Sequence, residues 1–162
     1  LERLAAAYGG TVARMMFASE AKPGQGVRPM TKLALGDKSL VPDILVSMTL
    51  PDGRTRPLAV EFENGANVND ARHALSKRDG YEVALAAGSS AFKEPLGCDA
   101  QPRLVMVFAT TELLRKVWGA WARSPGEEWP GVFMQSLDAL EADGATLWHR
   151  IGAKSSPLFP IQ

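Results

Sequence analysis

The segment between residues 41 and 50 alternates apolar and polar side chains, which predicts a β-strand. Its apolar positions are the even ones: Ile44, Val46, Met48 and Leu50. From Asp43 onward the odd positions are polar except for Leu45, and a period of two is typical of a strand with one buried face. Proline, aspartate and glycine follow at 51–53 and suit a three-residue hairpin loop. We therefore expect a hairpin whose second strand includes residues 58–63.

The loop fixes the register of this hairpin. With Leu50 opposite Arg54, counting back along both strands gives the expected pairs Thr49 with Thr55, Val46 with Leu58 and Ile44 with Val60. The same register places Asp43 opposite Glu61, with Glu63 one pair further along the same face. Pro57 lacks an amide donor, so that part of the second strand is expected to be an edge or a bulge.

Helices and strands alternate along the rest of the chain. We expect helices at 1–8, 70–87, 111–123 and 136–143, with Gly80 weakening the second. Strands are expected at 11–17, 103–110 and 131–135, and the near-continuous apolar run at 103–110 predicts a central strand buried on both faces. Loops are expected at 19–38, 65–69, 88–102 and 154–162. The predicted class is α/β (α+β), a mixed sheet flanked by helices in the order α-β-β-β-α-β-α-β-α.

Composition places limits on this picture. A chain of 162 residues with 46% hydrophobic and 22% charged residues suits one globular domain over 1–162, and no apolar run reaches the length of a membrane span. The formal net charge is zero, which argues against a protein that binds nucleic acid over its whole surface. The single cysteine, Cys98, fits a reducing cytoplasm and is expected to be structural. The chain starts with Leu1, so we expect a fragment of a longer protein.

The candidate chemistry lies in the three carboxylates of the hairpin. Asp43, Glu61 and Glu63 fall at the ends of otherwise apolar strands, where acidic groups are costly to desolvate. Opposed like charges are unfavourable unless a cation neutralises them, and hard divalent cations such as Mg²⁺ or Mn²⁺ prefer oxygen ligands. The sequence therefore predicts these three residues as metal ligands and catalytic groups.

Basic residues follow the carboxylates on the expected second helix. They are Arg72, His73, Lys77 and Arg78, and any of them could contact phosphate. His73, Lys77 and Tyr81 are four residues apart and so share one helix face. An ordinary solvated face explains the basic residues equally well.

The order of motifs resembles the PD-(D/E)xK nuclease-like superfamily, and within it the replication-relaxation family of plasmids and other mobile elements. The matching pieces are Pro42-Asp43, the run from Glu61 to Gly65, Lys77 with Tyr81, the strand ending Thr110-Thr111, and the segment 137–148 with its Leu, Gly and Trp. The resemblance covers roughly residues 40–150. It implies a restriction-endonuclease-like fold, DNA as substrate, and replication or mobilisation proteins as partners.

Two departures from that family pattern affect the functional interpretation. Glu63 stands where the family has a lysine two residues after the strand glutamate, and Lys77 on the next helix could replace it. The winged-helix part that usually precedes the domain is absent from this chain. In the active interpretation, Asp43, Glu61 and Glu63 hold the metal, Lys77 stabilises the transition state, and His73, Tyr81, Arg72 and Arg78 bind substrate phosphate.

Two other functions are open on the sequence. A catalytically inactive DNA- or protein-docking domain would explain the displaced lysine and the zero net charge. A two-carboxylate glycosidase ranks last, because few aromatic side chains lie near Asp43 to bind a sugar.

Overall fold

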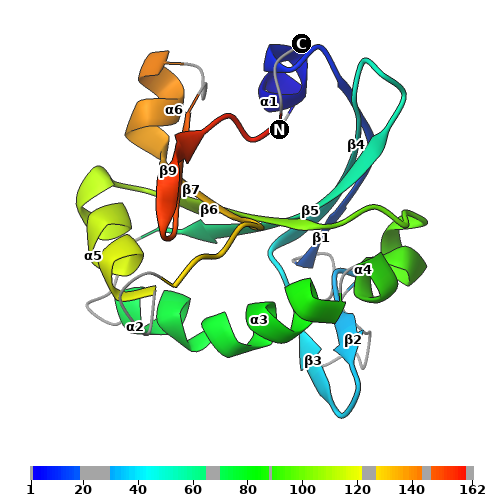
Figure 1. Ribbon diagram of the computed structural model, residues 1–162, viewed down its shortest axis with the longest axis horizontal. Coiled ribbons are helices and arrows are strands. Elements are labelled where there is room, and N and C mark those ends of the chain that lie inside the picture. Colours follow the sequence, from blue (N-terminus) through cyan, green and yellow to red (C-terminus); the bar gives the residue numbers. More distant parts are fainter. Residues whose placement is uncertain are drawn as a thin grey trace.

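A mixed seven-stranded β-sheet forms the centre of the fold, with helices on both sides (Figure 1). The computed structural model describes residues 2–18, 30–64, 70–87, 89–121, 127–143 and 147–159. The strands are β1 (Thr11–Phe17), β2 (Leu33–Leu35), β3 (Lys38–Leu40), β4 (Ile44–Thr49), β5 (Thr55–Glu63), β6 (Arg103–Phe108), β7 (Val132–Ser136), β8 (Trp148–Arg150) and β9 (Ala153–Ser156). The helices are α1 (Glu2–Ala7), α2 (Asp70–Ser76), α3 (Arg78–Ala87), α4 (Ser89–Leu96), α5 (Thr111–Trp121) and α6 (Leu137–Asp143).

The strand order of the main sheet is β1-β4-β5-β6-β7-β8-β9, and β2 pairs with β3 in a separate two-stranded sheet. Strands β5, β6 and β7 are parallel, whereas the pairs on either side of them are antiparallel. The predicted class, a mixed sheet flanked by helices, is confirmed.

The predicted hairpin and its register are confirmed. Thr49 pairs with Thr55, Val46 with Leu58 and Ile44 with Val60. At the loop, the amide of Leu50 donates to the carbonyl of Arg54 over 2.9 Å. Gly53 takes a φ of 78°, the left-handed conformation that glycine adopts without strain.

The expectation that this hairpin has only one buried face is wrong. Leu45 is fully buried on the face expected to be polar, and the central residues of β4 and β5 are buried on both sides. The reason is that α2 to α4 cover this second face, which local alternation does not reveal. Pro57 pairs with Ser47, but the β5–β6 pairing begins at Leu58, so β5 is an edge at its proline as predicted.

Several elements differ from the prediction. The helix expected at 70–87 is broken at Lys77, not at Gly80. The expected loops contain β2, α4 and most of β9, whereas β3 and β8 lie largely where no helix or strand was expected. Helix α4 was missed because its sequence is rich in Ser and carries Pro95, yet Phe92 and Leu96 bury one side of it. The turn expected at 65–69 lies outside the described residues.

Two cores lie on opposite faces of the main sheet. The lower core, seen below the sheet in Figure 1, joins Ala59 of β5 and Met106 of β6 to Ala74 and Tyr81 of the helices beneath. The upper core joins Val60 of β5 and Phe133 of β7 to Ala5 of α1 and to the C-terminal Leu158 and Phe159. Cys98 is buried in the lower core. No helix in the described part of the chain has the length and apolarity needed to cross a membrane.

Candidate active site

Glu61 and Glu63 lie at the end of β5 on the face that packs against α2 and α3. They alternate with Phe62, so they share the direction of Ala59, a member of the lower core. Glu61 is 0% exposed and Glu63 4% exposed. Two carboxylates this deeply buried need partners that compensate for their lost hydration.

Asp43 reaches the same end of the hairpin from the residue before β4. Its Oδ2 atom accepts a hydrogen bond from the backbone amide of Phe62 over 2.9 Å. This bond ties Asp43 to the β5 residue between the two glutamates, and the negative charge of Asp43 acts on Glu61. Sequence reasoning could not single out the Phe62 donor, because nearly every residue carries a backbone amide.

Lys77 brings a positive charge to both buried glutamates. Its Nζ atom lies 2.5 Å from Oε2 of Glu61 and 3.1 Å from Oε1 of Glu63. Its side chain is 16% exposed, so the ion pairs are poorly screened by water. The three charges form one compact cluster between β5 and the helical layer.

Lys77 separates α2 from α3, but helical hydrogen bonds continue across it. The hydroxyl of Ser76 donates to the carbonyl of His73 over 2.7 Å, a local bond that competes with regular helix hydrogen bonding. The backbone amide of Lys77 still donates to the carbonyl of His73 over 3.3 Å, and the amide of Tyr81 donates to the carbonyl of Lys77 over 3.1 Å. The four-residue spacing therefore keeps the side chains of His73, Lys77 and Tyr81 on the side that faces the glutamates.

Tyr81 and His73 occupy opposite environments on that side. The hydroxyl of Tyr81 donates to Oε1 of Glu61, and the tyrosine is 0% exposed. The hydroxyl of Tyr81 is thus engaged by Glu61 within the protein, and its contact with a substrate phosphate stays a prediction. His73 is 63% exposed, with Nδ1 3.7 Å from Oε2 of Glu63.

Burial dominates the electrostatics of Glu61 and raises its pKa to about 7. The charge of Lys77 and the hydrogen bonds from Lys77 and Tyr81 oppose this shift, while the nearby Asp43 adds to it. Glu61 is thus poised to exchange a proton near neutral pH, a property that is frequent at functional sites.

Lys77 and Tyr81 respond to the same carboxylates. Burial lowers the pKa of Lys77, but the charges of Glu61 and Glu63 outweigh it, so the net pKa is raised. Burial raises the pKa of Tyr81 well above its usual value, and the charge of Glu61 raises it further. Both side chains therefore stay protonated at neutral pH and act on Glu61 as hydrogen-bond donors.

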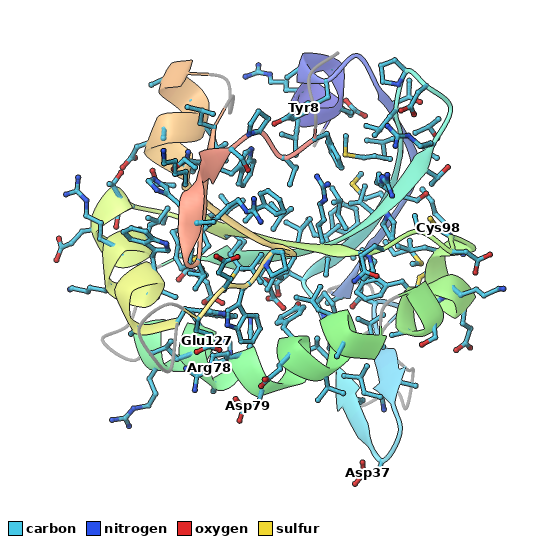
Figure 2. The ribbon with its side chains drawn as sticks, viewed as in Figure 1. Tyr8, Asp37, Arg78, Asp79, Cys98 and Glu127 are labelled. Carbon is cyan, nitrogen blue, oxygen red and sulfur yellow. The ribbon has the colours of Figure 1, made fainter. Side chains whose placement is uncertain are left out.

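The two other predicted phosphate ligands differ from each other. Arg72 is exposed on α2. Arg78 instead donates from Nη1 to the carbonyl of Trp121 over 2.8 Å and so holds α3 against the end of α5. Figure 2 shows Arg78 below the sheet, beside Asp79, whose carboxylate lies 3.7 Å from its Nε atom. The structure thus gives Arg78 an inter-helix contact, and its binding of substrate stays a prediction.

The carboxylates suit a hard cation in their chemistry and, in part, in their placement. Glu61 and Glu63 each direct an oxygen at one ammonium group, so the pair can share a single cation. Within the residues described, however, no three carboxylate, imidazole or thiol side chains converge closely enough to hold a metal. Asp43 stands beside this pair, and a metal would compete with Lys77 for the same oxygens.

Comparisons of this chain with protein-family models, with curated proteins and with solved structures gave no match.

Proposed function

We propose that the chain is a metal-dependent DNA endonuclease-like domain that acts in the replication or mobilisation of a plasmid or mobile element in the cytoplasm. The observation that carries this proposal is the contact of the Lys77 ammonium group with two buried glutamates. A lysine beside acidic residues at a strand end is the arrangement that the nuclease-like resemblance implies, with the lysine moved from the strand to the following helix.

The chain's own residues would divide the work as follows. Asp43, Glu61 and Glu63 would hold Mg²⁺ or Mn²⁺ once they draw together around the ion, since the three carboxylates do not converge without it. Such an ion lowers the pKa of bound water and neutralises charge on a phosphodiester. Tyr81 orients Glu61 through its hydroxyl. Lys77 would donate to the negative charge that develops on the phosphate. His73, which is exposed, and Arg72 would contact the DNA backbone.

The element order of the core supports the same proposal. Setting aside the separate β2–β3 sheet and α4, the chain runs α1, β1, β4, β5, the α2–α3 pair and β6. This is the α-β-β-β-α-β order expected from the resemblance. The acidic residues lie at the end of its third strand and the lysine on the helix that follows.

A catalytically inactive DNA- or protein-docking domain is the second candidate. Lys77 contacts both glutamates and thereby compensates part of their charge without a metal. A buried ion cluster of this kind can simply hold α2 and α3 against the sheet. The zero net charge of the chain also suits a docking role better than DNA binding over the whole surface.

Metal binding and DNA nicking separate the two candidates. We would titrate Mn²⁺ by calorimetry and follow nicking of supercoiled plasmid, using the variants Glu61→Gln and Asp43→Asn. The matched control is Glu112→Gln, which changes an exposed glutamate of α5. The nuclease proposal expects binding and nicking in the unaltered protein and in Glu112→Gln, and loss of nicking in both site variants. Nicking that survives Glu61→Gln would refute the site. Absence of Mn²⁺ binding at millimolar concentration would leave the docking function.

A further inference from the structure

A second charged site lies on the other face of the sheet. It is a pocket of about 300 Å³ between β6, β7, β8 and the C-terminal segment. Its lining residues are Arg103, Pro130, Phe133, Arg150, Ser156, Pro157 and Phe159. Phe133 and Phe159 belong to the upper core, whereas Glu61 faces the lower one. The sheet therefore separates this pocket from the carboxylate cluster.

Strand pairing brings the two arginines of the pocket together. Arg103 begins β6, and Arg150 on β8 pairs with Phe133 on β7. Arg103 lies over the rings of Phe133 and Phe159, at 5.2 and 4.9 Å from their centres, and Arg150 lies 5.5 Å from the centre of Phe133. These cation–π contacts fix the guanidinium groups against the walls of the pocket.

Aromatic stacking leaves polar hydrogens of both arginines without acceptors. Nη1 of Arg103 and Nε of Arg150 are buried and have no hydrogen-bond partner among the described residues. Nη2 of Arg150 donates a long hydrogen bond, 3.4 Å, to the carbonyl of Pro130. Buried donors are nearly always paired in proteins, so unpaired donors on two arginines that line the same pocket show that the protein itself does not satisfy these side chains.

An acceptor for these donors must also carry negative charge. Across the described ranges, no carboxylate forms an ion pair with Arg103 or Arg150. Burial, together with the positive charges of Arg56 and Arg150, lowers the pKa of Arg103 to about 10. Like charges held together in a partly buried pocket destabilise each other until an anion neutralises them.

We propose that this pocket binds the phosphate group of a small ligand, either free inorganic phosphate or the 5′-phosphate of a mononucleotide. Planar guanidinium groups present paired N–H donors that match phosphate oxygens, and Arg103 and Arg150 together offer two positive charges for a dianion. The pocket volume falls at the small end of the range for ligand sites, which suits a phosphate or a small phosphate ester. The inference is independent of the endonuclease proposal, because it uses no residue of the carboxylate cluster.

Thermal unfolding across a phosphate concentration series tests the proposal. The buffer contains EDTA and has its ionic strength held constant with chloride, so neither metal binding nor screening changes. We expect a saturable rise in the melting temperature, because a ligand that binds only the folded state stabilises it. Arg103→Gln and Arg150→Gln should each weaken the fitted phosphate affinity at least tenfold, and if one variant does not fold, the other supplies the result.

Matched variants locate the binding. Arg115→Gln removes an arginine that is exposed on α5 and does not line the pocket, and should leave phosphate affinity unchanged. Lys77→Met should also leave it unchanged. A shift that never saturates, that persists in both pocket variants, or that disappears in Lys77→Met would overturn the proposal.

The source of the phosphate is decided by comparing ligands. A 5′-mononucleotide that binds tenfold more tightly than inorganic phosphate, with no binding of its nucleoside, would identify a nucleotide as the ligand. Equal affinity for phosphate and mononucleotide would identify the free anion. Acetate that binds as tightly as phosphate would contradict the assignment, because it would show a general carboxylate site.

Discussion

The ammonium group of Lys77 lies 2.5 Å from Oε2 of Glu61, although one residue follows α2 and the other belongs to β5. Sixteen positions of sequence separate the partners. Their contact joins the helical layer to the sheet through charge rather than through apolar packing alone. It also makes Glu61 sensitive to any change at Lys77 or at Tyr81, its other hydrogen-bond donor.

Glu61 should make the protein less stable as the pH rises from about 4.5 to 7. Its pKa is about 7 in the folded state against an ordinary value of 4.5, so in this window the folded state binds more protons than the unfolded one. At ~1.4 kcal/mol per pKa unit, this group lowers the free energy of unfolding by up to about 3 kcal/mol. Urea unfolding at pH 5, 6, 7 and 8 should show that the free energy of unfolding falls less steeply with pH in Glu61→Gln than in the unaltered protein. Equal pH slopes in the two proteins would contradict the assignment.

Removal of the positive charge at Lys77 should destabilise the fold most strongly at high pH. Lys77→Met leaves Glu61 and Glu63 buried without their cation, and breaking a buried pair costs about 3 kcal/mol. At pH 5, Glu61 is protonated and the loss should be smaller. The control is Lys116→Met, which breaks an exposed pair with Glu112 and should change urea unfolding little at either pH.

The two tyrosines offer a matched test of the hydroxyl on Glu61. Tyr81→Phe removes a buried donor to a carboxylate, which should lower the free energy of unfolding by about 2 kcal/mol and raise the pKa of Glu61 above 7. Tyr8→Phe removes the acceptor of the Leu158 amide in the upper core, where Figure 2 shows Tyr8 beneath α1. It should cost about 1 kcal/mol and leave the pH dependence unchanged. Identical pH profiles in both variants would show that Tyr81 does not act on Glu61.

Gly152 should tolerate no side chain in the turn between β8 and β9. Its φ is 72°, and an added Cβ would lie 2.3 Å from the carbonyl oxygen of Glu127. Gly36 has a similar φ of 68° but open space around it, so Gly36→Ala reports backbone strain alone, about 1 kcal/mol. Gly152→Ala should lower the melting temperature clearly more than Gly36→Ala does, and an equal effect of the two variants would contradict the close approach.

Local patterns in the sequence determined the hairpin and the placement of its acidic residues. Alternation and the Pro-Asp-Gly loop fix the register between neighbouring strands, because both act over a few residues. The four-residue spacing of His73, Lys77 and Tyr81 likewise fixed which side chains share a helix face. The sequence therefore identified the residues of the carboxylate cluster before any coordinates, although it did not predict the contacts of Tyr81 with Glu61 and of Arg78 with Trp121.

Tertiary structure alone decided how buried these groups are and what charges surround them. The second buried face of β5, the pKa of Glu61 and the meeting of Arg103 with Arg150 all depend on elements that are distant in sequence. Short elements such as β8, β9 and α4 also escaped prediction, because three to eight residues give too little periodicity against Gly, Ser and Pro. Burial is a property of the assembled layers, and the desolvation that shifts the pKa of Glu61 and of Arg103 follows from it.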